Sequence, residues 1–450
     1  MVSLFLSMWI FVVLMLYLGP MVTMLPIALI PVVGQDWYRI ITGIIDYYGR
    51  QTIMCIPFSW CNTRCIMHNA DIFMRVKEGG KTKNGNSIIL SNHCSRIDWI
   101  GAEYVSMCGR SPTNWRIKGT SCPRVNFVAE VTTALMPIAG WSRFLFGDIL
   151  LQRAFHKDSK RILDNIAMFK KIGVDRCLFL APEGTVADPG RPDDDAYIHE
   201  CAEFMKSIGR KPLKFLLTPR YKGMTNFVTL APENVACATI AFIEGYSSIN
   251  KETGGVEGGD LCTLRLDDAR RKIPDLHDIF SGGLTLYIEF QTIDVSDDAN
   301  AVDKQGQSLI KMQLIEDQIR KDRELAYFEQ HRKFPGVESA ADWTDLRPIP
   351  SSPIASHMYL NLLMLGGLAV EFKLLALMAG VPTFTIAKML LYVFIFLYTS
   401  HTLSYNVGRL LTDGVSRESL VGETAVKALL TVLLGRSTNQ GGKQTKPKAS

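Results

Sequence analysis

The first 33 residues constrain how this chain can be built, because Val2–Val33 contains no charged side chain. A helix needs roughly 20 apolar residues to cross the hydrocarbon core of a bilayer. Pro20, Pro26 and Pro31 interrupt the run, so a kinked span and a helical hairpin within one leaflet both fit. The run is longer than the roughly 7–15 apolar residues of a signal peptide, and no basic segment precedes it. The pattern therefore favours a membrane segment that is retained.

A second apolar region, residues 356–411, predicts two transmembrane helices joined by a tight turn at Gly380-Val381-Pro382. The segment Leu420–Leu434 carries sparse charges and fits an amphipathic helix in the membrane interface. Basic residues follow the first membrane segment and end the chain. The positive-inside rule therefore predicts a multi-pass protein whose intervening domain faces the cytosol.

Lys446 and Lys448 resemble the dilysine signal of endoplasmic reticulum membrane proteins, and chance spacing in a lysine-rich tail explains them equally well. We expect the endoplasmic reticulum membrane as the location. These observations divide the chain into a membrane segment with its linker at 1–52, a domain at 53–335, a linker at 336–355, two transmembrane helices at 356–411, and an amphipathic helix with a basic tail at 412–450. Within the domain, residues 245–283 are rich in glycine and charge and predict a mobile surface insertion.

Several classes of protein are disfavoured. The 10 cysteines show no paired framework, and no Asn-x-Ser/Thr acceptor occurs, so nothing indicates a disulfide-bonded lumenal domain. Cys61, Cys65 and His68 have a loosely metal-like spacing without an evident fourth ligand, so we expect no metal site. The net charge of +5 comes without a basic stripe interleaved with aromatic residues, so we expect no nucleic-acid partner.

Between the membrane segments, strand-like runs alternate with helix-like stretches, which predicts an α/β domain with a central sheet flanked by helices. The expected strands are 87–91, 176–181, 213–218, 234–242 and 284–290, and the expected helices lie near 96–108, 127–136, 157–172, 194–208 and 220–231. Ligands of such domains bind at turns that follow strands. The polar turns of this chain are therefore its candidate site.

The first polar turn contains His93 and Asp98, directly after the apolar run Ser87–Ser91. An imidazole with a pKa of about 6.5 accepts a proton near neutral pH, and a carboxylate on its other nitrogen fixes the tautomer. Five residues along a helix are about 140° apart, so we place His93 in the turn and Asp98 in the first turn of a helix. The spacing from Ser95 to Asp98 also fits a plain capping box, which the spacing alone favours.

Three further apolar runs end in polar turns. One leads into Pro182-Glu183-Gly184-Thr185, the second ends in Arg153, and the third ends in Pro219-Arg220. The forked guanidinium of an arginine suits a phosphate. Each turn by itself has an ordinary surface explanation.

Together and in this order, the four turns resemble the glycerophospholipid acyltransferase family. Its blocks are Asn-His-x4-Asp, a Gly…Arg block, Pro-Glu-Gly-Thr and a strand ending in proline, and they match residues 92–98, 147–153, 182–185 and Pro219. Asp98-Trp99, residues 137–141, residues 218–220 and the charged helix around 313–328 are most similar to the lysocardiolipin and lysophosphatidylinositol acyltransferase branch. Val186 stands where many relatives carry arginine, and Glu130 where lysine is usual.

The resemblance implies transfer of an acyl group from acyl-CoA, a co-substrate, to a free hydroxyl of a lysophospholipid, without a metal or cofactor. The implied acceptor is lysophosphatidylinositol, monolysocardiolipin or lysophosphatidate. The resemblance assigns catalysis to His93 and Asp98, phosphate binding to Arg153, orientation of the glycerol or of Arg153 to Glu183, and substrate binding to Gly184, Thr185, Pro219 and Arg220. The lipid bilayer is the implied partner.

Three alternatives accompany this interpretation. An acyl-cysteine route through Cys94 is disfavoured, because adjacent residues in a turn usually point apart and the family implies direct transfer. A lipid hydrolase would use the same histidine and aspartate to activate water. A non-catalytic lipid-binding scaffold would keep the fold without the reaction.

Overall fold

The computed structural model describes residues 63–77, 87–107, 124–131, 147–172, 176–228 and 234–345, apart from short gaps at 96, 153, 263, 269–272, 276–277, 280–282, 297, 299 and 304–305, and positions 373 and 377 singly. Within these ranges, every helix is too short or too polar to cross a bilayer. The membrane segments predicted at 1–33 and 356–411 and the amphipathic helix predicted within 412–450 lie outside the described residues.

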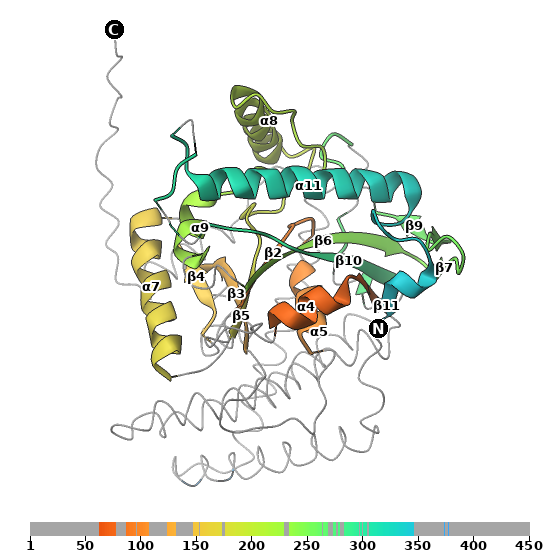
Figure 1. Cartoon of the computed structure of the whole chain (residues 1–450), viewed down its shortest axis with the longest axis horizontal. Helices are drawn as coiled ribbons and strands as arrows, with labels where there is room; N and C mark the ends of the chain where they lie inside the picture. The colour runs from red at the N-terminus through yellow and green to blue at the C-terminus, as the bar shows by residue number, and fades with distance from the viewer. Residues whose placement is uncertain are drawn as a thin grey trace. The chain divides into compact units, whose positions relative to one another are not determined.

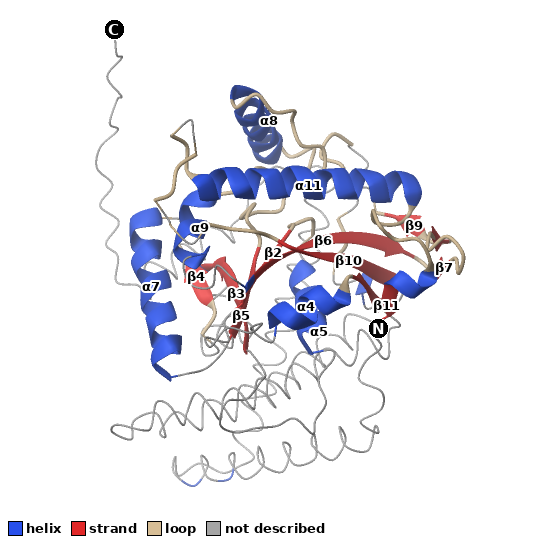
Figure 2. Ribbon diagram, in the orientation of Figure 1, coloured by secondary structure: helices blue, strands red, loops and turns tan. Residues whose placement is uncertain are grey.

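The domain is built on a mixed, nine-stranded sheet with the order β11-β1-β10-β6-β2-β5-β3-β4, and β9 pairs beside β6 (Figures 1 and 2). The strands are β1 Arg64–His68, β2 Ser87–Ser91, β3 Arg124–Glu130, β4 Ile149–Leu151, β5 Arg176–Leu180, β6 Val235–Glu244, β9 Asp260–Leu261, β10 Leu284–Thr292 and β11 Trp343–Asp345. A separate hairpin joins β7 Ser248–Ile249 to β8 Val256–Glu257. The series β6-β2-β5-β3-β4 is parallel, so the carboxyl ends of these strands meet at one edge.

Helices cover both faces of the sheet. The described helices are α4 Ala70–Lys77, α5 Asp98–Met107, α7 Phe155–Ile172, α8 Pro192–Ser207, α9 Tyr221–Val228 and α11 Leu309–His331, followed by the 3-10 helix η5 Ala340–Asp342. Two residues of β10 on opposite faces of the sheet show the two layers. Tyr287 packs on Phe328 of α11, whereas Phe290, three positions later, packs on Phe73 of α4. In Figure 1, α11 accordingly runs along one side of β6 and β10, and α4 and α5 lie on the other.

The central strands are apolar because both of their faces are covered. All five residues of β2 are buried, as are the first nine of the ten residues of β6. Parallel strands covered on both faces have such continuous apolar runs. The strands predicted at 87–91, 176–181, 234–242 and 284–290 are therefore confirmed as β2, β5, β6 and β10.

Two sequence predictions are wrong. Residues 213–218 form no strand; Phe215, Leu216 and Leu217 are buried in irregular backbone whose N–H groups bind carboxylates, Asp322 for Phe215 and Glu183 for Leu217. The prediction of a helix at 127–136 is also wrong for residues 127–130, which belong to β3. An apolar run shows that a segment is buried without showing which partner its backbone finds.

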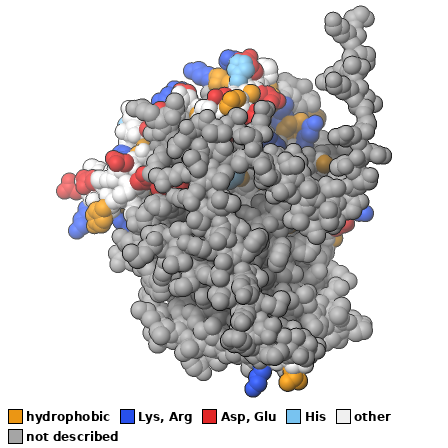
Figure 3. Space-filling model, turned by 180° about the vertical axis from the view of Figure 1, so that it is seen from behind, with side chains coloured by type: hydrophobic (Ala, Val, Ile, Leu, Met, Phe, Trp, Pro, Cys, Tyr) orange, Lys and Arg blue, Asp and Glu red, His pale blue; other side chains and the backbone are white. Residues whose placement is uncertain are grey.

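The sheet also extends past residue 335, where we placed the end of the domain. β11 pairs with β1, and Trp343 donates its indole N–H to the carbonyl of Gly254 at 2.8 Å. The described part of 245–283 is packed rather than loose, because Val256, Cys262 and Leu264 belong to the core. On the described surface visible in Figure 3, acidic and basic side chains are interspersed.

Candidate active site

His93 and Asp98 form a direct pair between β2 and α5. The imidazole Nδ1 lies 3.0 Å from Asp98 Oδ2. At this distance Nδ1 carries a proton and donates it in a hydrogen bond to the carboxylate. The His93 side chain is 31% exposed and the Asp98 side chain 7%, so the imidazole reaches solvent while its partner is buried. The structure confirms the prediction that His93 lies in the turn and Asp98 begins the helix. Nε2 is the nitrogen left to accept a proton.

Asp98 also organises the turn itself. Its Oδ2 accepts the backbone N–H of Ser95 at 3.1 Å, its Oδ1 accepts the Ser95 hydroxyl at 2.7 Å, and Ser95 Oγ accepts the backbone N–H of Ile97 at 3.0 Å. One half of the predicted capping box is therefore present, because the carboxylate that pairs with His93 also accepts the Ser95 N–H, whereas Ser95 Oγ binds the N–H of Ile97 rather than that of Asp98. These bonds fix the carboxylate that orients the imidazole.

The surroundings raise the pKa of His93. Burial alone lowers this pKa, but the hydrogen bond to Asp98 and the negative charges of Asp98 and Glu183 together outweigh the effect of burial. A base with a raised pKa holds an abstracted proton more firmly. The imidazolium formed when His93 takes a proton is therefore stabilised by its neighbours.

The residues on either side of His93 anchor the turn to β6. Asn92 is fully buried; its Oδ1 accepts the N–H of Ile240 at 2.7 Å, and its Nδ2 donates to the Ile240 carbonyl at 3.0 Å. Cys94 is also buried, and its Sγ lies 3.6 Å from the same carbonyl. The thiol points into the core while the imidazole reaches solvent, as expected for adjacent residues in a turn.

Glu183 joins this turn to two others. Its side chain is buried, its Oε1 accepts the backbone N–H of His93 at 2.9 Å, and its Oε2 accepts the backbone N–H of Leu217 at 3.0 Å. We expected Glu183 to orient the glycerol or Arg153. Among the described residues, each of its carboxylate oxygens accepts a backbone N–H, and the prediction for the glycerol and Arg153 is not tested, because Arg153 lies outside these residues. Glu183 therefore ties the turn of His93 to the segment of Leu217.

A family model described as Acyltransferase matches residues 69–232. This segment is similar to an acyltransferase domain. The match contains the His93 turn, Glu183 and Arg220, and it supports the resemblance to the glycerophospholipid acyltransferases for this part of the chain. The strands β6 and β10 and the helix α11 follow the matched residues and complete the same sheet and its cover.

The third and fourth of the four predicted blocks meet at Gly184. The backbone N–H of Arg220 donates to the carbonyl of Pro182 at 2.8 Å, and the Arg220 side chain lies across Gly184, where an added Cβ would sit 3.0 Å from Arg220 Cδ. Pro219 is buried, Thr185 is half-buried, and Arg220 is exposed. The structure thus brings four predicted substrate-binding residues into adjoining turns.

Tyr197 on α8 holds the Arg220 side chain, and the sequence did not reveal this role. The guanidinium carbon lies 5.3 Å from the centre of the Tyr197 ring, and Nε lies 3.3 Å from the tyrosine oxygen. No carboxylate of the described residues lies within 4.0 Å of this guanidinium. Stacking on an aromatic ring fixes an arginine while its N–H groups still face outward.

The second block turns from β4 into α7. Arg153 lies outside the described residues, but its neighbours are fixed: the backbone N–H groups of Gln152 and Ala154 donate to the two oxygens of Asp158 at 2.8 and 2.9 Å. Asp148 accepts the backbone N–H of Phe127 at 3.0 Å and so ties this block to β3. Both carboxylates act on backbone groups.

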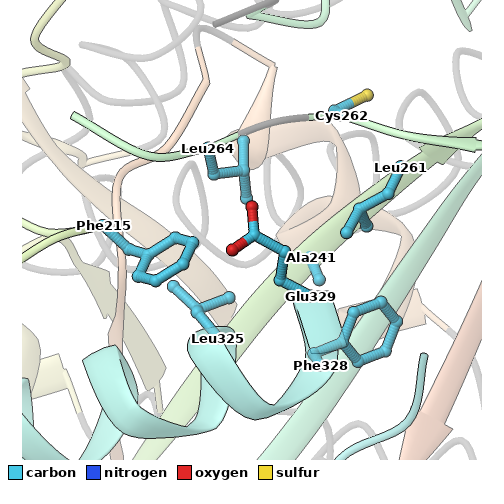
Figure 4. A pocket seen from close by; sticks show the side chains of 8 residues that line it. All are labelled: Phe215, Ala241, Leu261, Cys262, Leu264, Leu325, Phe328 and Glu329. Carbon is cyan, nitrogen blue, oxygen red and sulfur yellow. The ribbon is translucent and has the colours of Figure 1, made fainter. Parts of the chain in front are cut away.

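A small, mostly apolar hollow lies elsewhere, between α11 and the segment that contains β9 (Figure 4). It is lined by Phe215, Ala241, Leu261, Cys262, Leu264, Leu325, Phe328 and Glu329. None of these residues belongs to the turns of His93, Glu183 or Arg220. We assign the hollow no part in the reaction.

Proposed function

We propose that the protein transfers a fatty acyl group from acyl-CoA to a free hydroxyl of a lysophospholipid. The single observation that supports this most is the His93–Asp98 pair, 3.0 Å apart, within an acyltransferase domain. A neutral imidazole whose Nδ1 is held by a carboxylate is a general base for a hydroxyl.

In the proposed reaction, Nε2 of His93 removes the proton of the acceptor hydroxyl as its oxygen attacks the thioester carbonyl. The carbon–sulfur bond then breaks, and the imidazolium returns the proton to the departing CoA thiolate. Asp98 holds the tautomer and stabilises the imidazolium throughout. Atoms and charge balance without a metal or a further cofactor.

We assign the phosphate of a substrate to Arg220, with Arg153 as the second cation. Arg220 supports this role because Tyr197 fixes its exposed guanidinium beside the turn of Glu183. Gly184 and Thr185 would then face the substrate, and Pro219 would set the direction of Arg220. The preferred acceptors are lysophosphatidylinositol, monolysocardiolipin and lysophosphatidate, by resemblance to their acyltransferases.

We further propose that the reaction takes place at a bilayer, in the endoplasmic reticulum membrane and on its cytosolic side. The apolar segments predicted at 1–33 and 356–411 and the lysines near the C-terminus support this location. The acceptor and the product are both lipids, so a membrane anchor keeps the site beside them.

The test is acyl transfer from labelled oleoyl-CoA in membranes that contain the wild type or His93→Ala, with each of the three acceptors offered separately. A diacyl product that depends on His93 supports the proposal and identifies the acceptor. Labelled free fatty acid as the only His93-dependent product supports a hydrolase instead. Neither product, together with rescue of deficient cells by His93→Ala, supports a lipid-binding scaffold.

A further inference from the structure

Lys321 is a buried cation that the mechanism above does not use. It lies on α11, outside the residues matched by the acyltransferase model, and its exposed fraction is 0%. Its Nζ donates to the carbonyl of Leu90 at 2.9 Å and lies 2.8 Å from Asp317 Oδ2. Removing an ammonium group from water is costly, so a lysine in this place calls for an explanation.

The first partner of Lys321 belongs to the strand that leads into the base. Leu90 is the second-last residue of β2 and precedes His93 by three positions. One turn earlier on α11, Gln318 donates its Nε2 to the carbonyl of Leu217 at 2.9 Å. The helix therefore binds the backbone on both sides of the Glu183 carboxylate.

These contacts close a ring through the site. The N–H groups of Leu217 and His93 donate to the two oxygens of Glu183, and β2 leads from His93 back to Leu90. Lys321 and Gln318 then connect Leu90 to Leu217 through one turn of α11. The backbone of His93 is thus connected to α11 in two ways, through Leu90 and Lys321 and through Glu183, Leu217 and Gln318.

Lys321 also acts on the charge of Glu183. Burial raises the pKa of Glu183, while the N–H groups of His93 and Leu217 and the positive charges of His93 and Lys321 oppose this rise without cancelling it. An ionised carboxylate accepts both N–H groups, whereas a protonated one presents an O–H to one of them. The ammonium therefore favours the form of Glu183 that the ring requires.

Asp317 keeps this cation paired in the interior. Burial alone raises the pKa of Asp317, but the charges of Lys321 and Arg320, and their hydrogen bonds, outweigh it and lower the pKa. Asp317 also pairs with Arg320 at 2.8 Å. Asp317 and Lys321 therefore form a buried ion pair on α11 whose geometry is fixed by these bonds.

We propose that Lys321 is a positioning residue for the reaction. It binds the Leu90 carbonyl and favours the ionised form of Glu183, and thereby fixes the turn that carries His93. The inference rests on the proposed function, because it concerns the same reaction. If Lys321 had only a packing role, replacing the buried ion pair by uncharged residues of similar volume would leave kcat unchanged. Such replacements are often neutral or stabilising.

The experiment uses the full chain in membranes with the acceptor that the wild type acylates. Three variants are compared: Lys321→Met, the double variant Asp317→Asn with Lys321→Met, and the matched control Arg323→Met on the exposed side of α11. For each we measure the thermal midpoint, kcat, the KM of both substrates, and kcat as a function of pH.

We expect folded Lys321→Met and the double variant to lose at least about tenfold in kcat with KM changed by less than about twofold, because positioning acts on the transition state. We also expect the acid limb of the kcat profile of Lys321→Met to move to higher pH, because loss of the Lys321 charge raises the pKa of Glu183, whose ionised form accepts both N–H groups. The double variant loses an anion together with the cation, so its acid limb should move less. Arg323→Met should match the wild type.

The double variant covers the case in which Lys321→Met alone does not fold, because it also removes the Asp317 charge, which Arg320 alone would otherwise have to compensate. A folded double variant with the kcat of the wild type would overturn the inference, and so would a folded Lys321→Met with the kcat and pH profile of the wild type. Wild-type protein that acylates none of the acceptors would overturn the proposed function instead, so the two failures are distinguishable.

Discussion

Glu183 accepts the backbone N–H of His93 at 2.9 Å, across 90 positions of sequence. The second oxygen of the same carboxylate accepts the N–H of Leu217. One buried side chain thus sets the distance between three turns, and the turn of His93 carries the proposed base. The geometry of the base therefore depends on a residue that need not touch the substrate.

Glu183→Gln should damage both stability and turnover. A glutamine keeps one acceptor oxygen but turns an NH2 group toward the N–H of either His93 or Leu217, so one buried donor loses its partner. Leaving a buried donor unsatisfied costs about 1–3 kcal/mol. A misplaced base lowers kcat by up to about 100-fold. Thermal unfolding and kcat measure the two effects, and Glu203→Gln on the exposed side of α8 is the control. Unchanged kcat in folded Glu183→Gln would refute the aligning role.

His93→Ala should remove acyl transfer, whereas Cys94→Ala should not. General-base catalysis contributes roughly 100- to 10,000-fold, so loss of the imidazole should lower kcat by that amount. Cys94 is buried and its Sγ lies near the Ile240 carbonyl, so its removal costs some packing and no chemistry. The measurement is the initial rate of diacyl lipid formation at saturating substrates. An inactive but folded Cys94→Ala would revive the acyl-cysteine route.

The rate of acyl transfer should rise with pH through the raised pKa of His93. The base must be neutral to accept a proton, and the hydrogen bond and charge of Asp98 help to raise its pKa above the ordinary value of about 6.5. The acid limb of kcat should therefore have its midpoint above about pH 6.5. Asp98→Asn removes the charge and leaves only an uncharged amide oxygen as acceptor, so the midpoint should move to lower pH while the maximum rate falls.

The control for that titration is Asp164→Asn, on an exposed position of α7. This substitution also removes one negative charge from the protein. In the described hydrogen bonds, Asp164 makes no contact with the His93 imidazole. A midpoint that moves equally in both variants would mean that the overall charge of the protein, rather than the Asp98 contact, sets the pKa of the base.

The sequence predicted the central strands and the His93–Asp98 turn because both follow from local chemistry. A strand buried on two faces is a continuous apolar run, as in Ser87–Ser91, and a histidine directly after it must lie in the turn. The role of Glu183 could not be predicted in this way. Its partners are backbone N–H groups distant in sequence, and any residue type at position 217 other than proline offers the same N–H.

The burial of α11 could not be predicted from its polar sequence either. Asp317, Gln318, Lys321 and Glu324 are charged or polar, which is typical of an exposed helix face, yet all four are buried. They bind other polar groups in the interior, such as Thr239 of β6, whose hydroxyl donates to Glu324 at 2.6 Å. Sequence patterns register polarity, but pairing in the interior depends on the assembled fold.

Gly184→Ala should impair binding of the substrate phosphate more than it impairs folding. Gly184 has φ +70°, and an added Cβ would lie 3.0 Å from Arg220 Cδ. Backbone strain of this kind costs about 1–3 kcal/mol. Gly209→Ala is the matched control, because Gly209 has φ +71° with nothing within 4 Å of the added Cβ. Both variants should lose similar stability, and only Gly184→Ala should raise KM, because it displaces Arg220.

The same two variants show whether the phosphate bound by Arg220 belongs to the lysophospholipid or to acyl-CoA. A raised KM for the lysophospholipid alone assigns Arg220 to the acceptor, and a raised KM for acyl-CoA alone assigns it to the donor. If Gly184→Ala leaves both KM values at those of Gly209→Ala, Arg220 holds no substrate phosphate.

Asn92→Asp should destabilise the protein, and more at high pH than at low pH. The amide of Asn92 donates to the Ile240 carbonyl at 3.0 Å in a fully buried position, and an aspartate oxygen would face that carbonyl instead. Burial near Asp98 and Glu183 would raise the pKa of the new carboxyl, and its protonated form could donate in place of the amide. The folded state then binds more protons than the unfolded state, so stability should fall as pH rises from about 5 to about 8. Denaturant unfolding at the two pH values measures this slope, with the exposed Asn300→Asp as control. An equal loss at both pH values would mean that the Ile240 carbonyl does not require a donor from position 92.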